Sequence, residues 1–335
     1  MRVGTALLSC LMLAATLFAA SPVRVVYDTD IGNDVDDAIG LAMLHAFETR
    51  GEARLLAVTI SKDNRYAAPF VSLFNAFYGR PDIPIGVVRN GKTPDDGAFL
   101  KQVDGMKKPD GSPLYPRRLE DAAAAPEAVS LLRRVLAKEA DGAVTVVQVG
   151  FSTNLARLLN SSPDEASPLP GRELVARKVA KLVMMAGRFS GGGNPEYNVA
   201  KDLPASQKVF AEWPGEIVTS GYEVGASILY DPQRLAADFR YADRHPLVDA
   251  YRHHKPMPFS EQLWDPSAVL YAVRPYRSYF TLSAAGTIQT DAKGATSLVE
   301  SAKGKHRYLM VNDAQRAAVR ETISVLMSEP PERRP

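Results

Sequence analysis

The sequence predicts an α/β protein built on an open, mainly parallel sheet with mixed edges and with helices on both faces. Two observations carry this prediction. Short apolar, β-branched runs alternate along the chain with segments whose apolar residues recur at helical spacing. The short runs are apolar throughout, which is typical of strands covered on both faces. Ligands of such sheets bind beyond the carboxyl ends of the strands.

The predicted elements follow one another in regular order. The strands are VRVVY at 23–27, RLLAVTI at 54–60, IPIGVV at 83–88, AVTVVQV at 143–149, KLVMMAG at 181–187 and GEIVTS at 215–220. Helical spacing occurs at 36–47, 67–79, 126–140, 153–160 and 204–213. The segment 107–126 is rich in proline and charge and is expected to be a surface loop.

The composition places the chain among globular proteins. It has 335 residues, of which 46% are hydrophobic, enough to bury a large core. Its 40 Lys and Arg against 38 Asp and Glu give a formal charge of +2, so no general field attracts nucleic acid or acidic lipid. We therefore expect a small-molecule partner, no nucleic acid and no stable membrane association of the mature chain. The oligomeric state is not fixed, and a homo-oligomer is compatible with the sequence.

Residues 1–21 are predicted to be a cleaved export signal. Arg2 precedes an unbroken apolar stretch, and small residues near Ala20 and Ser21 suit a signal peptidase. The alternatives are a buried first helix or an uncleaved anchor, but the apolar run is short for a membrane span. The only cysteine, Cys10, lies in this segment, so the mature chain would have no disulfide. The expected location is periplasmic or secreted, with one domain at 22–328 and a disordered tail at 329–335.

A cluster of aspartates follows the first predicted strand. The segment DTDIGNDVDD, residues 28–37, places five aspartates in ten positions. Capping of the next helix would explain one or two of these acids, but not all five. Asp28 and Asp30 are expected to point the same way, and Asp36 and Asp37 to join them from the helix start. Grouped carboxylates repel one another unless a cation or protons neutralise them, so the cluster predicts a calcium or magnesium site.

These residues resemble the signature of the inosine-uridine preferring nucleoside hydrolases, D-x-D-P-G-x-D-D-A. Further blocks follow in the family's order: VGFSTNLARLL at 149–159, MMAGRFSGGGNPEYNVAKDLPAS at 184–206, LWDPSAVLYAV at 263–273 and GTIQTDAKGAT at 286–296. The resemblance spans residues 23 to about 311. It implies a nucleoside hydrolase-like fold and the calcium-dependent hydrolysis of the N-glycosidic bond of ribonucleosides or related ribosides to free base and ribose.

The resemblance assigns roles residue by residue. When the DDA ends are aligned, Asp30, Asp37 and Asp265 match calcium-binding carboxylates, and Thr153 matches a ligand that acts through its main-chain oxygen. Asp36 matches an aspartate that contacts the ribose and the region of the metal-bound water. Asp30 is the candidate base that takes a proton from the attacking water. Substrate contacts are implied for Asn64, Asn194, Glu196, Asn198 and Trp264.

The signature departs from the family's pattern in its loop. Two extra residues stand between Gly32 and Asp36, and Ile31 replaces the usual proline. Asp34 could therefore enter the metal shell.

A second departure concerns the leaving group. Trp264 stands where many members carry a histidine thought to protonate a departing purine. His253 and His254 both precede Asp265, in a stretch that is expected to form a mobile loop. Of the two, His254 is the candidate for that acid. The alternative is two solvated surface histidines. Without an acid, Trp264 would serve as a stacking surface for the base.

Other functions stay open at this stage. A periplasmic nucleoside-binding or sugar-binding protein could keep the calcium and ribose contacts without hydrolysis. A haloacid-dehalogenase-type phosphatase also has an apolar strand that runs into D-x-D, but the sequence has no matching late acidic pair after a lysine. The site residues also have ordinary interpretations: Thr153 as a helix cap, Asn194 as a turn residue and Glu196 as a surface acid.

Overall fold

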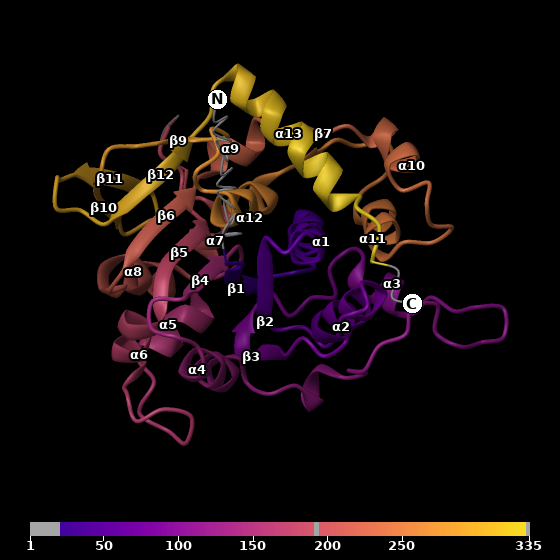
Figure 1. Ribbon diagram of the computed structural model, residues 1–335, viewed down its shortest axis with the longest axis horizontal. Coiled ribbons are helices and arrows are strands. Elements are labelled where there is room, and N and C mark those ends of the chain that lie inside the picture. The colour runs from indigo at the N-terminus through magenta and orange to yellow at the C-terminus, as the bar shows by residue number, and fades with distance from the viewer. Residues whose placement is uncertain (1–20, 191–193, 333–335) are drawn as a thin grey trace, which may run out of the picture.

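A ten-stranded sheet forms the centre of the molecule. The computed structural model describes residues 21–190 and 194–332, and Figure 1 shows the sheet between its helices. The strand order is β11-β10-β12-β6-β5-β4-β1-β2-β3, with β9 paired to β12. The strands are β1 (Val23–Thr29), β2 (Ala53–Lys62), β3 (Ile85–Lys92), β4 (Val144–Gln148), β5 (Val179–Met185), β6 (Glu216–Ser220), β9 (Thr281–Leu282), β10 (Gly286–Thr290), β11 (Thr296–Glu300) and β12 (His306–Met310).

The sheet is parallel from β12 to β3 and antiparallel at its other edge. β12 pairs with β6 in parallel, whereas β10 pairs antiparallel with both β11 and β12. The predicted mainly parallel sheet with a mixed edge is confirmed, and all six predicted strands are present. The strands β9 to β12 were not predicted as strands, because they are short and partly exposed and so lack the continuous apolar run of a buried strand.

β1 and β4 are neighbours at the point where the strand order reverses. β2 and β3 follow on one side of β1, and β4, β5 and β6 follow on the other. β1 pairs in parallel with both β2 and β4. Because the connecting helices leave toward opposite faces at such a point, a crevice opens there beyond the carboxyl ends of the strands.

Helices cover both faces of the sheet, and each face has its own hydrophobic core. One core contains Val25 and Tyr27 of β1, and the other contains Val26, as the alternation of side chains along a strand requires. The first face carries α1 (Asp36–Thr49), α2 (Ala67–Phe77), α11 (Pro246–His254), α12 (Trp264–Val273) and α13 (Asp313–Met327). The second face carries α4 (Ala128–Lys138), α5 (Thr153–Leu159), α6 (Gly171–Lys178) and α8 (Leu203–Glu212).

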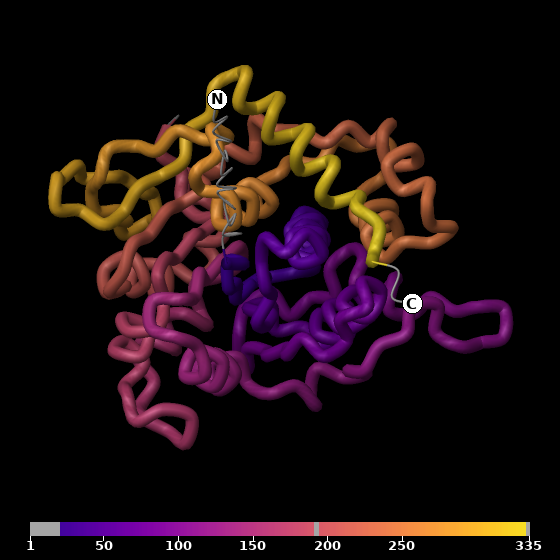
Figure 2. Tube along the Cα trace, in the orientation of Figure 1, coloured from indigo at the N-terminus to yellow at the C-terminus, as the bar shows by residue number. Residues whose placement is uncertain are grey.

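The C-terminal helix returns to the N-terminal part of the chain. In the tube view of Figure 2, α13 lies beside α1, and the two helices share the first core. Beyond α13, Glu329 accepts a hydrogen bond from Arg50 at 2.6 Å, so the predicted tail begins with a tethered residue. The predicted export signal lies outside the described residues apart from Ser21.

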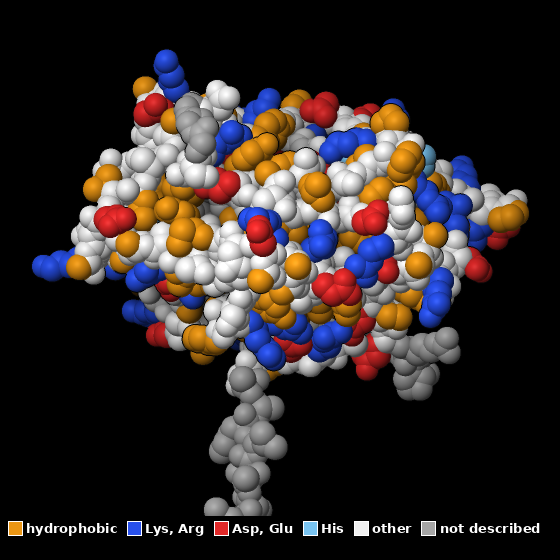
Figure 3. Space-filling view, turned by 90° about the horizontal axis from the view of Figure 1, so that it is seen from above, with side chains coloured by type: hydrophobic (Ala, Val, Ile, Leu, Met, Phe, Trp, Pro, Cys, Tyr) orange, Lys and Arg blue, Asp and Glu red, His pale blue; other side chains and the backbone are white. Residues whose placement is uncertain are grey.

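Small elements complete the fold at the rim of the sheet. The helices are α3 (Leu100–Asp104), α7 (Tyr197–Lys201), α9 (Tyr222–Ala226) and α10 (Leu235–Asp238), and β7 (Leu229–Tyr230) pairs antiparallel with β8 (Glu261–Gln262). Two short 3-10 turns occur at Ala122–Ala124 and Pro232–Arg234. Within the described residues, no helix is both long enough and apolar enough to cross a membrane. Acidic and basic side chains are interspersed over the face seen in Figure 3.

Candidate active site

The aspartate-rich loop connects β1 to α1 at the switch point. Gly32 has a φ of 109°, and a Cβ there would come within 2.3 Å of a Leu100 side-chain carbon, so the turn requires glycine. The N-cap of α1 is Val35, and no side chain caps this helix. Helix capping therefore does not account for the aspartates.

A pocket of about 400 Å³ lies at this edge of the sheet. Its wall combines carboxylates with aromatic rings and is formed by the segments that follow β1, β3, β4, β5 and β6, together with the start of α12. The pocket has the size of a small-molecule site. The lining residues are Asp30, Gly32, Asn33, Asp34, Asp36, Asp37, Asp95, Gly97, Val149, Met185, Glu196, Tyr197, Asn198, Tyr222, Trp264 and Asp265.

Three buried carboxylates of the pocket form a group that could hold a metal ion. Asp36, Asp37 and Asp265 each offer an oxygen, and these atoms lie within 4.8 Å of one another. The Asp265 amide donates to Asp36 Oδ2 at 3.0 Å, which joins the starts of α1 and α12, and the Thr29 hydroxyl donates to Asp37. Burial, followed by repulsion between the carboxylates, raises the pKa of all three well above the usual range. Such a group is neutralised by protons or by a cation.

Asp30 lines the same pocket but does not belong to that group of three. It is held by Asn33 of the signature loop. Asn33 Nδ2 donates to Asp30 Oδ2 at 2.7 Å, and the buried Lys62 Nζ donates to Asn33 Oδ1 at 2.8 Å. Lys62 also donates to the Thr93 carbonyl at 2.7 Å. Burial raises the pKa of Asp30 to about 6, although the hydrogen bond from Asn33 and the charge of Lys62 each lower it. A residue of the lengthened loop therefore orients the candidate base.

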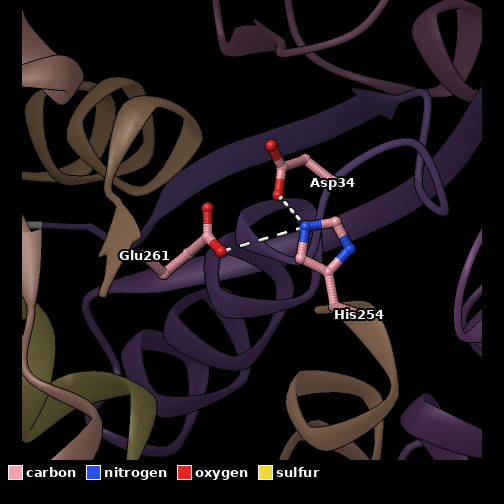
Figure 4. A group of neighbouring side chains, drawn as sticks. All are labelled: Asp34, His254 and Glu261. Atoms are coloured by element: carbon pink, nitrogen blue, oxygen red, sulfur yellow. Dashed lines mark ion pairs between the residues drawn. The ribbon is translucent and has the colours of Figure 1, made fainter. Parts of the chain in front are cut away.

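Asp34 binds a histidine on α11. Its Oδ1 lies 2.9 Å from His254 Nε2, and Glu261 Oε2 lies 3.9 Å from the same nitrogen, as Figure 4 shows. Lys255 Nζ lies 3.8 Å from Asp34 and 3.5 Å from Glu261. Burial raises the pKa of Asp34, but the hydrogen bond and charge of His254 outweigh it, and the pKa is lowered. Burial, with the charges of Asp34 and Asp36 beside it, raises the pKa of Glu261 to about 9.

His254 thus ends a helix instead of lying in a mobile loop, which corrects that part of the sequence prediction. Its ring is almost completely buried, faces Asp34 and does not line the pocket, whereas His253 is exposed. The role of His254 as a leaving-group acid stays a prediction, and its observed contact is with the signature loop.

Glu196 and Asn198 also line the pocket, at the start of α7. The Glu196 carboxylate accepts hydrogen bonds from the amides of Asn198, Val199 and Gly187 at 2.7, 3.1 and 3.2 Å. Asn198 Nδ2 donates to the Val149 carbonyl at 2.7 Å. Burial raises the pKa of Glu196 to about 7, although the hydrogen bonds from these amides lower it. Glu196 is therefore a buried helix cap within the pocket wall, not a surface acid.

Two aromatic rings from different elements meet at the pocket. Trp264 Nε1 donates to the Tyr222 carbonyl at 2.9 Å, and the ring centroids lie 5.6 Å apart. Gly225 makes this possible, because a Cβ there would lie 2.3 Å from the Trp264 Cα. Tyr197, which is 47% exposed, adds a third ring to the lining.

Besides His254, four predicted residues lie outside the lining of the pocket. Asp28 is held by Thr59 and Asn154 at 2.6 and 2.8 Å, so it does not point with Asp30 as expected. The other three are Asn64, whose Nδ2 donates to the carbonyls of Pro94 and Asp95; Thr153, a buried residue at the start of α5 whose hydroxyl donates to Asp202; and Asn194, an exposed residue.

Sequence reasoning missed several residues of the site. Asp95 and Tyr222 line the pocket, and both come shortly after a strand of the parallel sheet. The rule that ligands bind beyond the carboxyl ends of strands could have singled them out. The same rule applies to Lys62, the last residue of β2, whereas Glu261 carries no comparable signal, because only tertiary contacts bring it to the site.

Comparison with known proteins assigns the class. The family model of the inosine-uridine preferring nucleoside hydrolases matches residues 25–325. An uncharacterised protein of Schizosaccharomyces pombe is 27% identical over 271 residues, which cover 75% of this chain and 80% of that protein. The pyrimidine-specific ribonucleoside hydrolase RihA of Enterobacter sp. (strain 638) is 32% identical over 194 residues, which cover 56% of each chain.

A solved structure agrees with the fold. The inosine-uridine preferring nucleoside hydrolase of Bacillus anthracis superimposes with a TM-score of 0.67 at 19% identity, covering 90% of this chain and 99% of that one. The chain belongs to the family of inosine-uridine preferring nucleoside hydrolases. It is therefore an N-glycosidase, whose class of reaction is the hydrolysis of ribonucleosides.

Proposed function

We propose that this protein hydrolyses ribonucleosides with the help of one calcium ion bound beside Asp30. The observation that carries this proposal is the group of buried carboxylates formed by Asp36, Asp37 and Asp265, which shares one pocket with the rings of Tyr222 and Trp264. A sugar held at the carboxylates would place its base against the rings.

The carboxylates suit a hard divalent cation. Burial, followed by repulsion from neighbouring carboxylates, raises the pKa of Asp36, Asp37 and Asp265, and a cation would relieve that repulsion. Calcium accepts irregular arrangements of carboxylate oxygens better than magnesium does. From the family resemblance, Asp30 and the main-chain oxygen of Thr153 would complete the shell. When bound, the ion would make a coordinated water more acidic and hold ribose hydroxyls.

The residues of the chain supply the remaining chemistry. Asp30 is placed to accept a proton from the attacking water, with its carboxylate oriented by Asn33. The other carboxylates favour the positive charge that develops on the ribose ring as the glycosidic bond breaks. Asn198, which lines the pocket next to Glu196, would orient the sugar.

Among the ordinary, uncharged nucleosides, pyrimidine ribonucleosides are the expected substrates. The RihA relatives are named as pyrimidine-specific ribonucleoside hydrolases. A pyrimidine leaves with its charge spread over the ring, which suits a site in which Trp264 stands in place of the histidine that many members carry. From the predicted export signal, we also propose that this activity is located in the periplasm or outside the cell.

The test is the release of free ribose from uridine by the purified mature chain. We expect activity with calcium and at least a hundredfold loss after chelation, which added calcium restores. The variants Asp37→Asn and Asp265→Asn should lose both activity and calcium binding by calorimetry. Calcium binding without ribose release from any riboside would instead support a binding protein, and the absence of calcium binding would contradict the proposed metal.

A further inference from the structure

The charge of the pocket wall suggests which nucleosides this site prefers. Apart from two tyrosines, the ionisable side chains that line the pocket are carboxylates, and no Lys, Arg or His of the described chain is among the lining residues. The chain has five histidines, all within the described part. His45 and His245 are buried among aromatic rings, His306 lies in β12, His253 is exposed, and His254 faces Asp34.

Several cations contact residues of the pocket wall and are already engaged there. Lys62 is committed to Asn33, to the Thr93 carbonyl and to the Asp95 carboxylate. Lys255 lies between Asp34 and Glu261, and Arg188 lies over the Tyr222 ring at 3.8 Å from its centroid. None of these three side chains lines the pocket.

This arrangement has two consequences for a bound nucleoside. A divalent cation at Asp36, Asp37 and Asp265 would balance only part of the negative charge, because Asp30 and Glu196 also line the wall; Asp34 and Asp95 line it too, but they lie beside Lys255 and Lys62. A positively charged base would be attracted both by this field and by the faces of Trp264 and Tyr222. A phosphorylated nucleoside would be repelled.

The second consequence concerns the leaving group. The base of a neutral nucleoside must depart as an anion or receive a proton, and the pocket lining offers no Lys, Arg or His to supply one. The base of a cationic N-riboside departs as a neutral molecule and needs no proton. The same wall therefore favours both the binding and the cleavage of a cationic base.

We infer that the preferred substrates are N-ribosides with a positively charged base, of the pyridinium or N7-alkylpurinium type. This inference rests on the proposed hydrolase function. The oxygen of water bonds to the anomeric carbon, and the electron pair of the carbon–nitrogen bond returns to the ring nitrogen and cancels its charge. Asp30 takes one proton from the water and later releases it to solvent. The products are ribose, a neutral base and one proton.

The first experiment measures binding without cleavage. Two C-ribosides serve as probes, 3-ribosyl-1-methylpyridinium and 3-ribosyltoluene, which have nearly the same shape, differ in charge and have no cleavable C–N bond. We expect the cation to bind the calcium-loaded protein at least tenfold more tightly. Asp95→Asn should reduce this ratio, whereas Asp110→Asn, which removes an exposed charge outside the pocket, should not. Equal or weaker binding of the cation, or equal effects of the two variants, would overturn the inference.

The second experiment compares kcat/KM values. Nicotinamide riboside should exceed uridine by about a hundredfold and release one proton per turnover in a pH-stat, and 7-methylguanosine should exceed guanosine. Nicotinamide mononucleotide, which adds a 5′-phosphate, should be cleaved far more slowly than its riboside. If p-nitrophenyl riboside and uridine are cleaved but the cationic ribosides are not preferred, this inference fails alone. If no riboside releases ribose, the proposed function fails.

Discussion

Asn33, in the lengthened part of the signature loop, connects the candidate base to a buried cation. Its amide group donates to Asp30 and accepts from Lys62, so the carboxylate is fixed from the side of the loop. Two inserted residues could have disordered the site. Instead, Asn33 holds Asp30 and Asp34 holds His254.

Replacing Asn33 should change the pH dependence of catalysis. The hydrogen bond from Asn33 lowers the pKa of Asp30, which burial raises to about 6. In Asn33→Ala that pKa should rise, so the acidic limb of the profile of kcat/KM against pH should move to higher pH. Activity should therefore fall more at pH 6 than at pH 8. Asn160→Ala, at an exposed position after α5, is the control. An unshifted acidic limb would show that Asn33 does not tune the base.

At the scale of elements, α11 is attached to the signature loop by one side chain. His254, the last residue of the helix, lies against Asp34 and between the rings of Phe99 and Phe259. This contact links the loop that carries the candidate base to a helix more than two hundred positions later in the chain.

Removal of this contact should destabilise the protein. We expect His254→Ala to lower the free energy of unfolding by about 1 to 3 kcal/mol, since a buried ring and its 2.9 Å contact with Asp34 are lost. The exposed His253→Ala should stay within roughly 0.5 kcal/mol of the wild type. Chemical denaturation measures both values.

Kinetics of His254→Ala separate the two roles considered for this residue. A positioning role predicts similar losses of kcat/KM on inosine and on p-nitrophenyl riboside. A much larger loss on inosine would restore His254 as the acid that protonates the leaving base.

At the scale of the whole molecule, the stability of the metal-free protein and the stabilisation by calcium should change with pH in opposite directions. Burial raises the pKa of Asp28 and Glu196 to about 7 and that of Asp30 to about 6. The metal-free folded protein therefore holds protons that the unfolded chain has already lost, and its stability should fall as pH rises from about 4 to 7. Calcium binds the deprotonated carboxylates, so its stabilising effect should grow over the same range.

Thermal unfolding at pH 5.5 and pH 8 tests this coupling. Without calcium, the melting temperature should be lower at pH 8 by a few degrees. With saturating calcium, the increase in melting temperature should be larger at pH 8 than at pH 5.5. An equal increase at both values would mean that the carboxylates do not exchange protons for the metal.

The sequence by itself determined the sheet and the place of the site. Strands buried on both faces are rich in apolar residues, so β1 to β6 are visible as short, largely apolar runs. The aspartates after β1, the Glu-Tyr-Asn segment and the Trp-Asp pair could be located from their order along the chain, because that order matches the family. All of these segments contribute to the pocket.

The tertiary structure decided which side chains face one another. Asp28 and Asp30 are two residues apart, yet Asp28 is held by Thr59 and Asn154 while Asp30 lines the pocket. Asn64 is turned toward the carbonyls of Pro94 and Asp95. Such choices depend on hydrogen-bond partners and buried charges that come from distant segments, and local sequence patterns do not encode them. For the same physical reason, only the assembled pocket reveals a wall of carboxylates and aromatic rings to which the described residues contribute no basic side chain.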